Sequence, residues 1–175
     1  MVFGNLILTS TSLCRREIFN RVGVFSTEYE TLEDYDLFLR ITHQFDVAFV
    51  DKPLVCYRYS TNQLSGEAFY EKLCANLIEI FEKNVESIHD ESFFKRNGKR
   101  IKRHRSMIQA QQAYFYFSQD KMTLAANFYW KSIWNDPVRY KPYIYFLFSL
   151  LPIGITRFIR RLKSKSVEVP SKSGI

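Results

Sequence analysis

Three carboxylates lie within four residues of the segment TLEDYDLFLR, which covers residues 31–40. Glu33, Asp34 and Asp36 fall in the first turns of a helix that the apolar spacing predicts over residues 32–43. Carboxylates in that place meet the positive end of the helix dipole and can act as capping groups. A carboxylate held there can also take a proton from a hydroxyl within hydrogen-bond reach. Spacing alone favours capping and leaves the second use open.

The elements that must position these acids are predicted to alternate between helices and strands. Helices are expected where apolar residues recur at helical spacing, and strands where short apolar, β-rich runs occur. The hydroxyls of residues 9–12 are expected to cap the first helix, and Gly23 to end it. The expected strands are residues 2–8, 47–50 and 54–57, and the expected helices are residues 15–22, 32–43 and 67–86.

Three separated blocks of this region are residues 10–25, 33–40 and 47–58. In order and spacing they closely resemble the acceptor-side half of bacterial family 2 glycosyltransferases, which are inverting enzymes. The region that contains them, residues 8–65, is about a third of the chain. The resemblance implies an α/β fold, a Rossmann-like GT-A unit that binds a nucleotide sugar, with residues 1–66 as its acceptor-side part.

The resemblance also implies roles for particular residues. Asp34 would be the catalytic base, and Glu33 would contact substrate. Arg58 would lie near the donor diphosphate, where a guanidinium can form two hydrogen bonds to phosphate oxygens. From its position alone Arg58 can equally be a surface arginine at a strand end. Asp36 and Arg40 are expected to pair with the surrounding structure rather than with substrate.

Two differences from the family pattern concern the metal and the donor. Ser60 stands where many members have a histidine, and serine is a poor ligand for a divalent cation. The family's Asp-x-Asp motif, in its upstream nucleotide-binding units, is not found before Glu33. We therefore expect a divalent cation, Mg²⁺ or Mn²⁺, in the complete enzyme, with no metal ligand in this chain. We also expect the chain to need a donor-binding N-terminal half, covalently attached or as a partner subunit, in order to be active.

The composition changes after residue 92. Residues 1–92 carry eight Lys and Arg against fifteen Asp and Glu, whereas residues 93–175 carry seventeen against three. We expect residues 67–92 to form a linking amphipathic helix and residues 93–175 to form a basic helical region. Within that region, residues 105–137 have the spacing of one tetratricopeptide-like hairpin with a turn at residues 118–121. One unit is too few for a solenoid, which favours a single helical hairpin.

A basic region of this kind suits an anionic partner, either a membrane surface or nucleic acid. The dense run of Lys and Arg at residues 95–105 comes with no reading helix and no stacking sheet, so no nucleic acid is expected. The uncharged run between Lys141 and Arg157 is fifteen residues long, short of the ~20 that cross a bilayer. Residues 141–165 are therefore an in-plane membrane-interface segment or, alternatively, a buried hairpin with a solvated tail.

The resemblance to family 2 glycosyltransferases implies that the chain is a transferase component. The expected activity is inverting transfer of a sugar from a nucleotide-sugar donor to a glycan or lipid-linked acceptor, in the biosynthesis of a cell-surface polysaccharide. The expected location is cytoplasmic and peripheral, at the inner face of the plasma membrane. The alternative is a non-catalytic helical interaction or membrane-surface protein that retains a remnant of a transferase domain.

Overall fold

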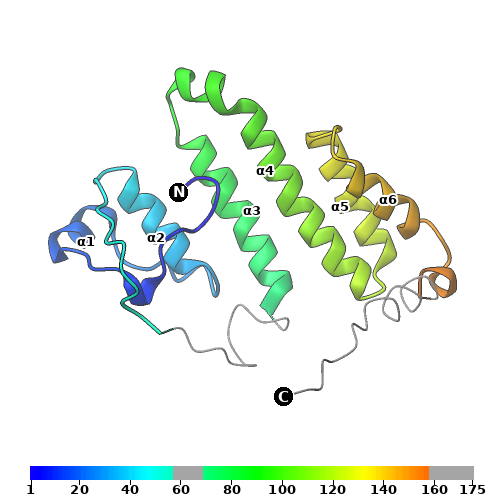
Figure 1. The fold of residues 1–175 in the computed structure, drawn as a ribbon, viewed down its shortest axis with the longest axis horizontal. Coiled ribbons are helices and arrows are strands. Elements are labelled where there is room, and N and C mark those ends of the chain that lie inside the picture. Colours follow the sequence, from blue (N-terminus) through cyan, green and yellow to red (C-terminus); the bar gives the residue numbers. More distant parts are fainter. Residues whose placement is uncertain (57–68, 158–175) are drawn as a thin grey trace, which may run out of the picture. The chain divides into compact units, whose positions relative to one another are not determined.

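The computed structural model describes residues 1–56 and 69–157, and every regular element within them is a helix (Figure 1). A short 3₁₀ helix, η1, is followed in the described residues by α-helices α1 to α6 and by a further helical stretch at residues 153–157. The chain divides into two compact units, residues 1–108 and residues 109–175, which are described separately below. The elements are η1 (Thr9–Thr11), α1 (Arg16–Val22), α2 (Glu33–Thr42), α3 (Tyr70–Glu86), α4 (Glu91–Ser118), α5 (Met122–Asn135) and α6 (Tyr140–Ser149).

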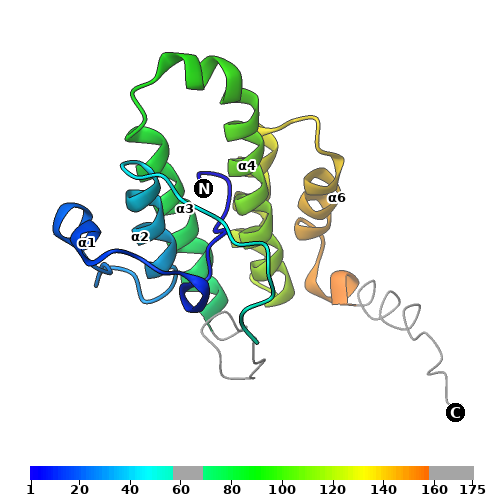
Figure 2. The ribbon, with the colours of Figure 1, turned by 60° about the vertical axis from the view of Figure 1, so that its left-hand side comes forward.

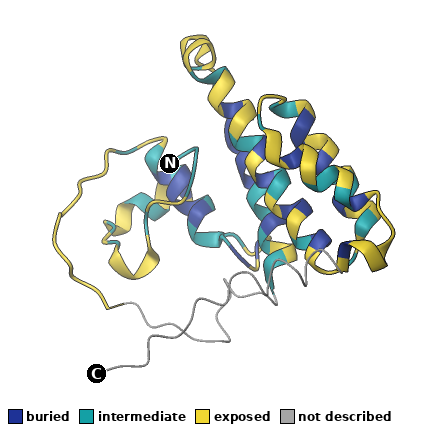
Figure 3. Cartoon of the chain, turned by 45° about the vertical axis from the view of Figure 1, so that its right-hand side comes forward, coloured by how far each residue is buried: buried dark blue, intermediate teal, exposed yellow. Residues whose placement is uncertain are grey.

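The predicted α/β fold class is wrong for the described residues, because none of the three expected strands forms. Residues 46–56 are exposed along their whole length, as Figure 3 shows for the segment that leads into the grey trace. At the other expected strand, the chain turns at once, with the Gly4 N–H donating to the Met1 carbonyl at 3.0 Å. A strand needs a second strand to pair its backbone groups, and short apolar runs do not supply one. These segments therefore remain irregular, with no Rossmann-like sheet in the described part of the chain.

The expected helices do form. Helix α1 ends at Gly23, whose φ of 78° is the left-handed conformation that favours glycine, and the Gly23 N–H donates to the Phe19 carbonyl at 3.0 Å. Helix α2 covers ten of the twelve residues predicted, and α3 covers residues 70–86 of the helix predicted at residues 67–86. The expected cap of α1 is wrong, because its N-cap is Arg15 and makes no side-chain cap bond. The Thr11 and Ser12 hydroxyls instead donate to the carbonyls of Leu8 and Thr9, at 2.9 Å each.

In the first unit α2 lies between α1 and α3 (Figures 1 and 2). Half of the residues of α2 are buried, on two sides of the helix. Leu37, Phe38 and Ile41 pack with Val22 of α1, while Tyr35 and Leu39 pack with residues of α3 and of the preceding loop. A helix that is apolar on two sides is stable only between two neighbours, which explains its central position.

Tyr35 also holds the first residues of the chain. Its hydroxyl is within 3.1 Å of the carbonyl oxygens of both Met1 and Val2, to which it donates. Burial raises the pKa of Tyr35 to about 12, so the phenol stays protonated and remains a donor.

Helix α4 contributes its first part to this unit, where it packs on α3 through a cluster of Phe81, Val85, Ile101 and Ile108. The basic run at residues 95–105 lies on this part of α4, and two of its arginines are engaged within the chain. Arg105 forms two hydrogen bonds with the Glu82 carboxylate, at 2.5 and 2.6 Å, and Arg100 lies 4.2 Å from the centre of the Phe3 ring. Through these contacts, part of the basic run holds α4 against α3 and against the first residues of the chain.

The second unit is built from the end of α4 with α5 and α6. Helix α4 ends at Ser118 and α5 begins at Met122, on either side of the expected turn. Ala113 and Ala125 are fully buried, and their small side chains let these two helices approach closely. Aromatic rings fill the remaining space, with Tyr129 stacked on Tyr145 at 5.8 Å between ring centres. None of the described helices is both long and apolar enough to cross a bilayer.

Candidate functional site

The Asp34 carboxylate lies in the first turn of α2 and is half buried. It accepts three hydrogen bonds, which come from three parts of the chain. The Thr9 hydroxyl donates to Oδ2 at 3.0 Å, the Asn5 amide donates to Oδ1 at 3.4 Å, and the Tyr35 N–H donates to Oδ1 at 2.7 Å. Donors on both oxygens hold the carboxylate in one orientation.

Of the two uses that the sequence left open for this acid, the structure shows the capping one. By accepting from the Tyr35 N–H, Asp34 satisfies one of the backbone donors that the first turn of a helix leaves unpaired. The N-cap itself is Leu32, which makes no side-chain cap bond and has a left-handed φ of 66°. That conformation costs a leucine roughly 1–2 kcal/mol, and burial of the Leu32 side chain against Tyr29 and Tyr35 offsets it. Glu33 follows, half buried, at the first position of α2.

Asp36 and Arg40 pair with the surrounding protein, as predicted, and the structure also pairs them with each other. The Arg40 guanidinium donates to Asp36 Oδ2 from Nε at 3.0 Å and from Nη2 at 2.8 Å. It also donates to the carbonyls of Val22 and of Val24, the latter at 2.9 Å. A cation at the carbonyl end of α1 is favoured by that helix's dipole, so the pair joins α2 to α1.

The remaining predicted site residues cannot be placed in this arrangement. Arg58 and Ser60 lie outside the described residues. Within the described ranges, no three His, Cys, Asp or Glu side chains come together as a metal site would require. The divalent cation that the resemblance implies therefore has no fitting ligand set here, and no step through a metal is assigned to these residues.

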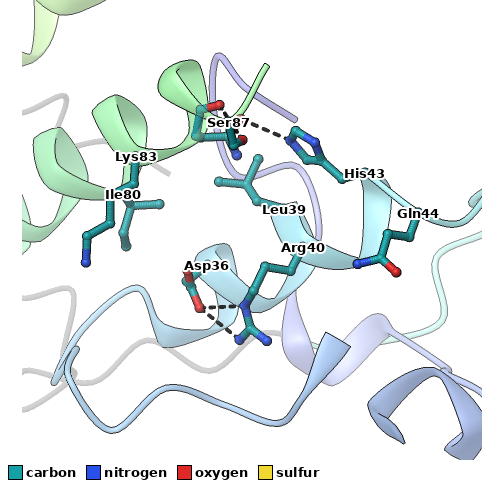
Figure 4. A pocket seen from close by; sticks show the side chains of 9 residues that line it. Asp36, Leu39, Arg40, His43, Gln44, Ile80, Lys83 and Ser87 are labelled. Carbon is teal, nitrogen blue, oxygen red and sulfur yellow. Dashed lines mark hydrogen bonds and ion pairs between the residues drawn. The ribbon is translucent and has the colours of Figure 1, made fainter. Parts of the chain in front are cut away.

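An open pocket of about 350 Å³ lies beside the same helix, between α2 and α3 (Figure 4). Sequence reasoning missed it, because its walls come from residues about forty positions apart. Its lining includes Asp36, Arg40, His43, Lys83 and Asn84. His43 Nε2 lies 3.2 Å from the Asn84 amide oxygen, an interaction visible in Figure 4.

The charged groups of the pocket are already satisfied by protein. Arg40 is held by Asp36, and Lys83 lies 2.9 Å both from the Tyr29 hydroxyl and from the Glu79 carboxylate. These two contacts raise the pKa of Lys83 above its ordinary value, so its charge is retained for them. Because Arg40 and Lys83 are already paired within the protein, the pocket has little positive charge left with which to bind an anion. Asp34 is therefore the better candidate site.

The sequence indicated Asp34 but not the residues that orient it. Thr9 was expected to cap α1, and Asn5 was expected within a strand; both instead donate to the carboxylate. No local signal could have paired them, because they lie 25 and 29 residues before Asp34.

Comparison of the chain with protein-family models, with curated proteins and with solved structures found no match.

Proposed function

We propose that this chain takes part in glycosyl transfer, as the acceptor-side component of a family 2-like inverting glycosyltransferase, with Asp34 as the general base. The donor is a nucleotide sugar and the acceptor is a glycan or a lipid-linked sugar. The reaction belongs to the cytoplasm, at the inner face of the plasma membrane, in the assembly of a cell-surface polysaccharide.

In the proposed step, the Asp34 carboxylate takes the proton of an acceptor hydroxyl while that oxygen attacks the anomeric carbon of the donor. A new C–O bond forms on one face of the sugar as the bond to the nucleoside diphosphate breaks on the other. The leaving diphosphate carries away the electron pair, and the configuration at the anomeric carbon inverts. A positioned base contributes roughly 10²–10⁴-fold to the rate of such a step.

The geometry around Asp34 is the observation that supports this role. A general base must be held in place and must be reachable by the hydroxyl it deprotonates. Asp34 is oriented by Thr9, Asn5 and the Tyr35 N–H and is only half buried, so it keeps accessible surface. Asp36, by contrast, is committed to Arg40. Of the two aspartates in this helix, Asp34 is the one that is both oriented and available.

In the proposed enzyme, most of the donor-binding site lies outside the helices described above. Arg58 contacts the donor diphosphate and Glu33 contacts substrate, while the Mg²⁺ or Mn²⁺ of the complete enzyme is held by the donor-binding half. That half is joined to the chain covalently or supplied as a partner subunit, and the chain has no activity without it.

The test measures sugar transfer by the chain combined with a family 2 donor-binding half, fused upstream or supplied as a subunit, over a panel of nucleotide sugars. Asp34→Asn is expected to lower kcat by about 10²-fold or more. Asp51→Asn is the matched control, because Asp51 is an exposed carboxylate of the same unit and is expected to leave kcat unchanged. If no combination transfers sugar, or if the Asp34→Asn enzyme is as active as the original, the proposal is wrong.

The rival function is that of a non-catalytic helical interaction protein. The observation in its favour is the amount of apolar surface on the second unit, where Trp134 is 80% exposed and Val138 is 89% exposed. Asp34→Asn distinguishes the two functions, since an interaction protein has no use for that carboxylate as a base.

A further inference from the structure

Helix α6 has apolar residues on both of its sides, and one of these sides is exposed. Tyr140, Tyr143, Ile144 and Leu147 follow one another at helical spacing, so they share a face, and all four are exposed. We name these four residues the α6 stripe. The opposite side of the helix supplies Tyr145, Phe146 and Phe148 to the core of the second unit. The core of the second unit is therefore packed without the residues of the α6 stripe.

Further exposed apolar residues follow the stripe in the chain and lie on the neighbouring helix α5. Leu150, Leu151, Ile153 and Ile155 follow it in the chain, and each is exposed. On α5, Trp130 and Trp134 lie one turn apart and are 54% and 80% exposed. The Trp130 ring lies 5.8 Å from that of Phe146 in α6, so the exposed tryptophans belong to the helix that packs beside the stripe. So many exposed apolar side chains on two neighbouring helices are typical of an interaction site.

The charge of the second unit indicates what the stripe contacts. Residues 1–108 carry fifteen Lys and Arg against fifteen Asp and Glu, whereas residues 109–175 carry ten against three. The whole net charge of +7 therefore belongs to the second unit. No Asp or Glu occurs from Pro137 to Val167, and Arg139 and Lys141 flank the first residue of the stripe.

We propose that the second unit lies in the plane of an anionic lipid surface, with the α6 stripe inserted among the headgroups. Basic residues beside an apolar face suit anionic headgroups, and Tyr and Trp place an apolar ring and a polar group at that boundary. A second copy of the chain is a poorer occupant, because it would bring one strongly basic unit against another.

The experiment uses the full chain and vesicles of phosphatidylcholine, with or without a third of phosphatidylglycerol. The chain is expected to sediment with the anionic vesicles, and to do so less as salt increases. Leu147→Asp is expected to weaken binding about tenfold, because it places a charge where a leucine side chain is buried in lipid. The matched control is Phe49→Asp, which changes an apolar residue of the first unit that is 86% exposed.

Tryptophan emission gives a second readout, since the chain has two tryptophans and both lie on α5. Anionic vesicles are expected to shift the emission to shorter wavelength, and lipids brominated near the headgroup are expected to quench it. Circular dichroism establishes that both variants keep the helical content of the original chain.

Three outcomes would overturn the proposal: no binding to anionic vesicles, equal binding by the Leu147→Asp variant, or an equal loss in the Phe49→Asp control. A doubled mass in solution that Leu147→Asp returns to the monomer, without vesicle binding, would assign the stripe to a second copy. Because neither variant touches Asp34, the result does not depend on the proposed transfer activity.

Discussion

The guanidinium of Arg40 forms an ion pair with the Asp36 carboxylate one helical turn earlier, at 2.8 Å. The same guanidinium donates to the backbone carbonyls of Val22 and Val24 at the end of α1. The pair within α2 thus orients a side chain that holds a second helix. This arrangement places α1 and η1 beside the helix that carries Asp34.

Arg40→Lys should destabilise the first unit, although it keeps the charge. A lysine ammonium cannot contact the carboxylate and two carbonyls in the geometry of the guanidinium. We expect a loss of about 1–2 kcal/mol in the free energy of unfolding, measured by urea denaturation with circular dichroism. Arg16→Lys, at an exposed position of α1, should change stability by less than about 0.5 kcal/mol. Equal stability of the two variants would argue against the role given to Arg40.

Thr9→Val should impair transfer without impairing folding. The Thr9 hydroxyl orients the proposed base, and valine keeps the shape of the side chain without the donor. In the completed enzyme we expect kcat to fall about tenfold with KM unchanged, and Thr9→Ser to restore it. Thr11→Val is the control, because the Thr11 hydroxyl donates only to the Leu8 carbonyl among the contacts found. A purely structural role for Thr9 would instead lower the stability of Thr9→Val and leave the kcat of the folded enzyme unchanged.

His104 should make the first unit less stable in mild acid. Burial, and then the charge of Arg100, lower the pKa of His104 below its ordinary value of 6.5. The unfolded chain takes up this proton as the pH falls through 6.5, whereas the folded chain does not. The stability that is complete above that pH is therefore lost progressively down to the lower folded-state pKa. Unfolding free energies measured from about pH 7.5 to about pH 5, a range that spans the ordinary pKa of 6.5, should show this decrease.

His104→Phe should remove that pH dependence. In the described structure, Nε2 of His104 is buried without a hydrogen-bond partner, and its ring packs against Phe3 and Phe81. A phenylalanine keeps the ring contacts and omits the unpaired nitrogen, so stability at pH 7 should rise by about 1 kcal/mol. His89→Phe, at an exposed position, should keep the original pH dependence. If the decrease in acid persists in the His104→Phe variant, another group is responsible for it.

Tyr129→Phe should stabilise the second unit. The Tyr129 hydroxyl is buried with no partner among the described residues, and its ring stacks on Tyr145. Removing only the oxygen should raise the unfolding free energy by about 1 kcal/mol. Tyr143→Phe is the contrasting change, because it removes a hydrogen bond of 3.1 Å to the Pro137 carbonyl and should destabilise slightly. Tryptophan fluorescence follows the unfolding, and a loss of stability in Tyr129→Phe would reveal a partner for its hydroxyl.

The fold was predictable from the sequence where contacts are local. The helix over residues 33–42 follows from apolar residues three and four positions apart, and the Asp36–Arg40 pair follows from the same spacing. The expected strands failed because a strand depends on a partner elsewhere in the chain, and apolar residues at 47–50 and 54–56 indicate no such partner. Residues 47–50 and 54–56, which were expected to form strands, therefore expose their apolar side chains to solvent.

What the sequence determined by itself about this protein is the position of α1, α2 and α3, the glycine that ends the first of them and the division of its charge. Each of these depends on residues that are close together in the chain or on composition alone. Only the tertiary structure decided that Thr9 and Asn5 orient Asp34, and that one side of α6 remains uncovered. Such contacts depend on how separate segments pack, because the energy of burying a side chain depends on what lies against it.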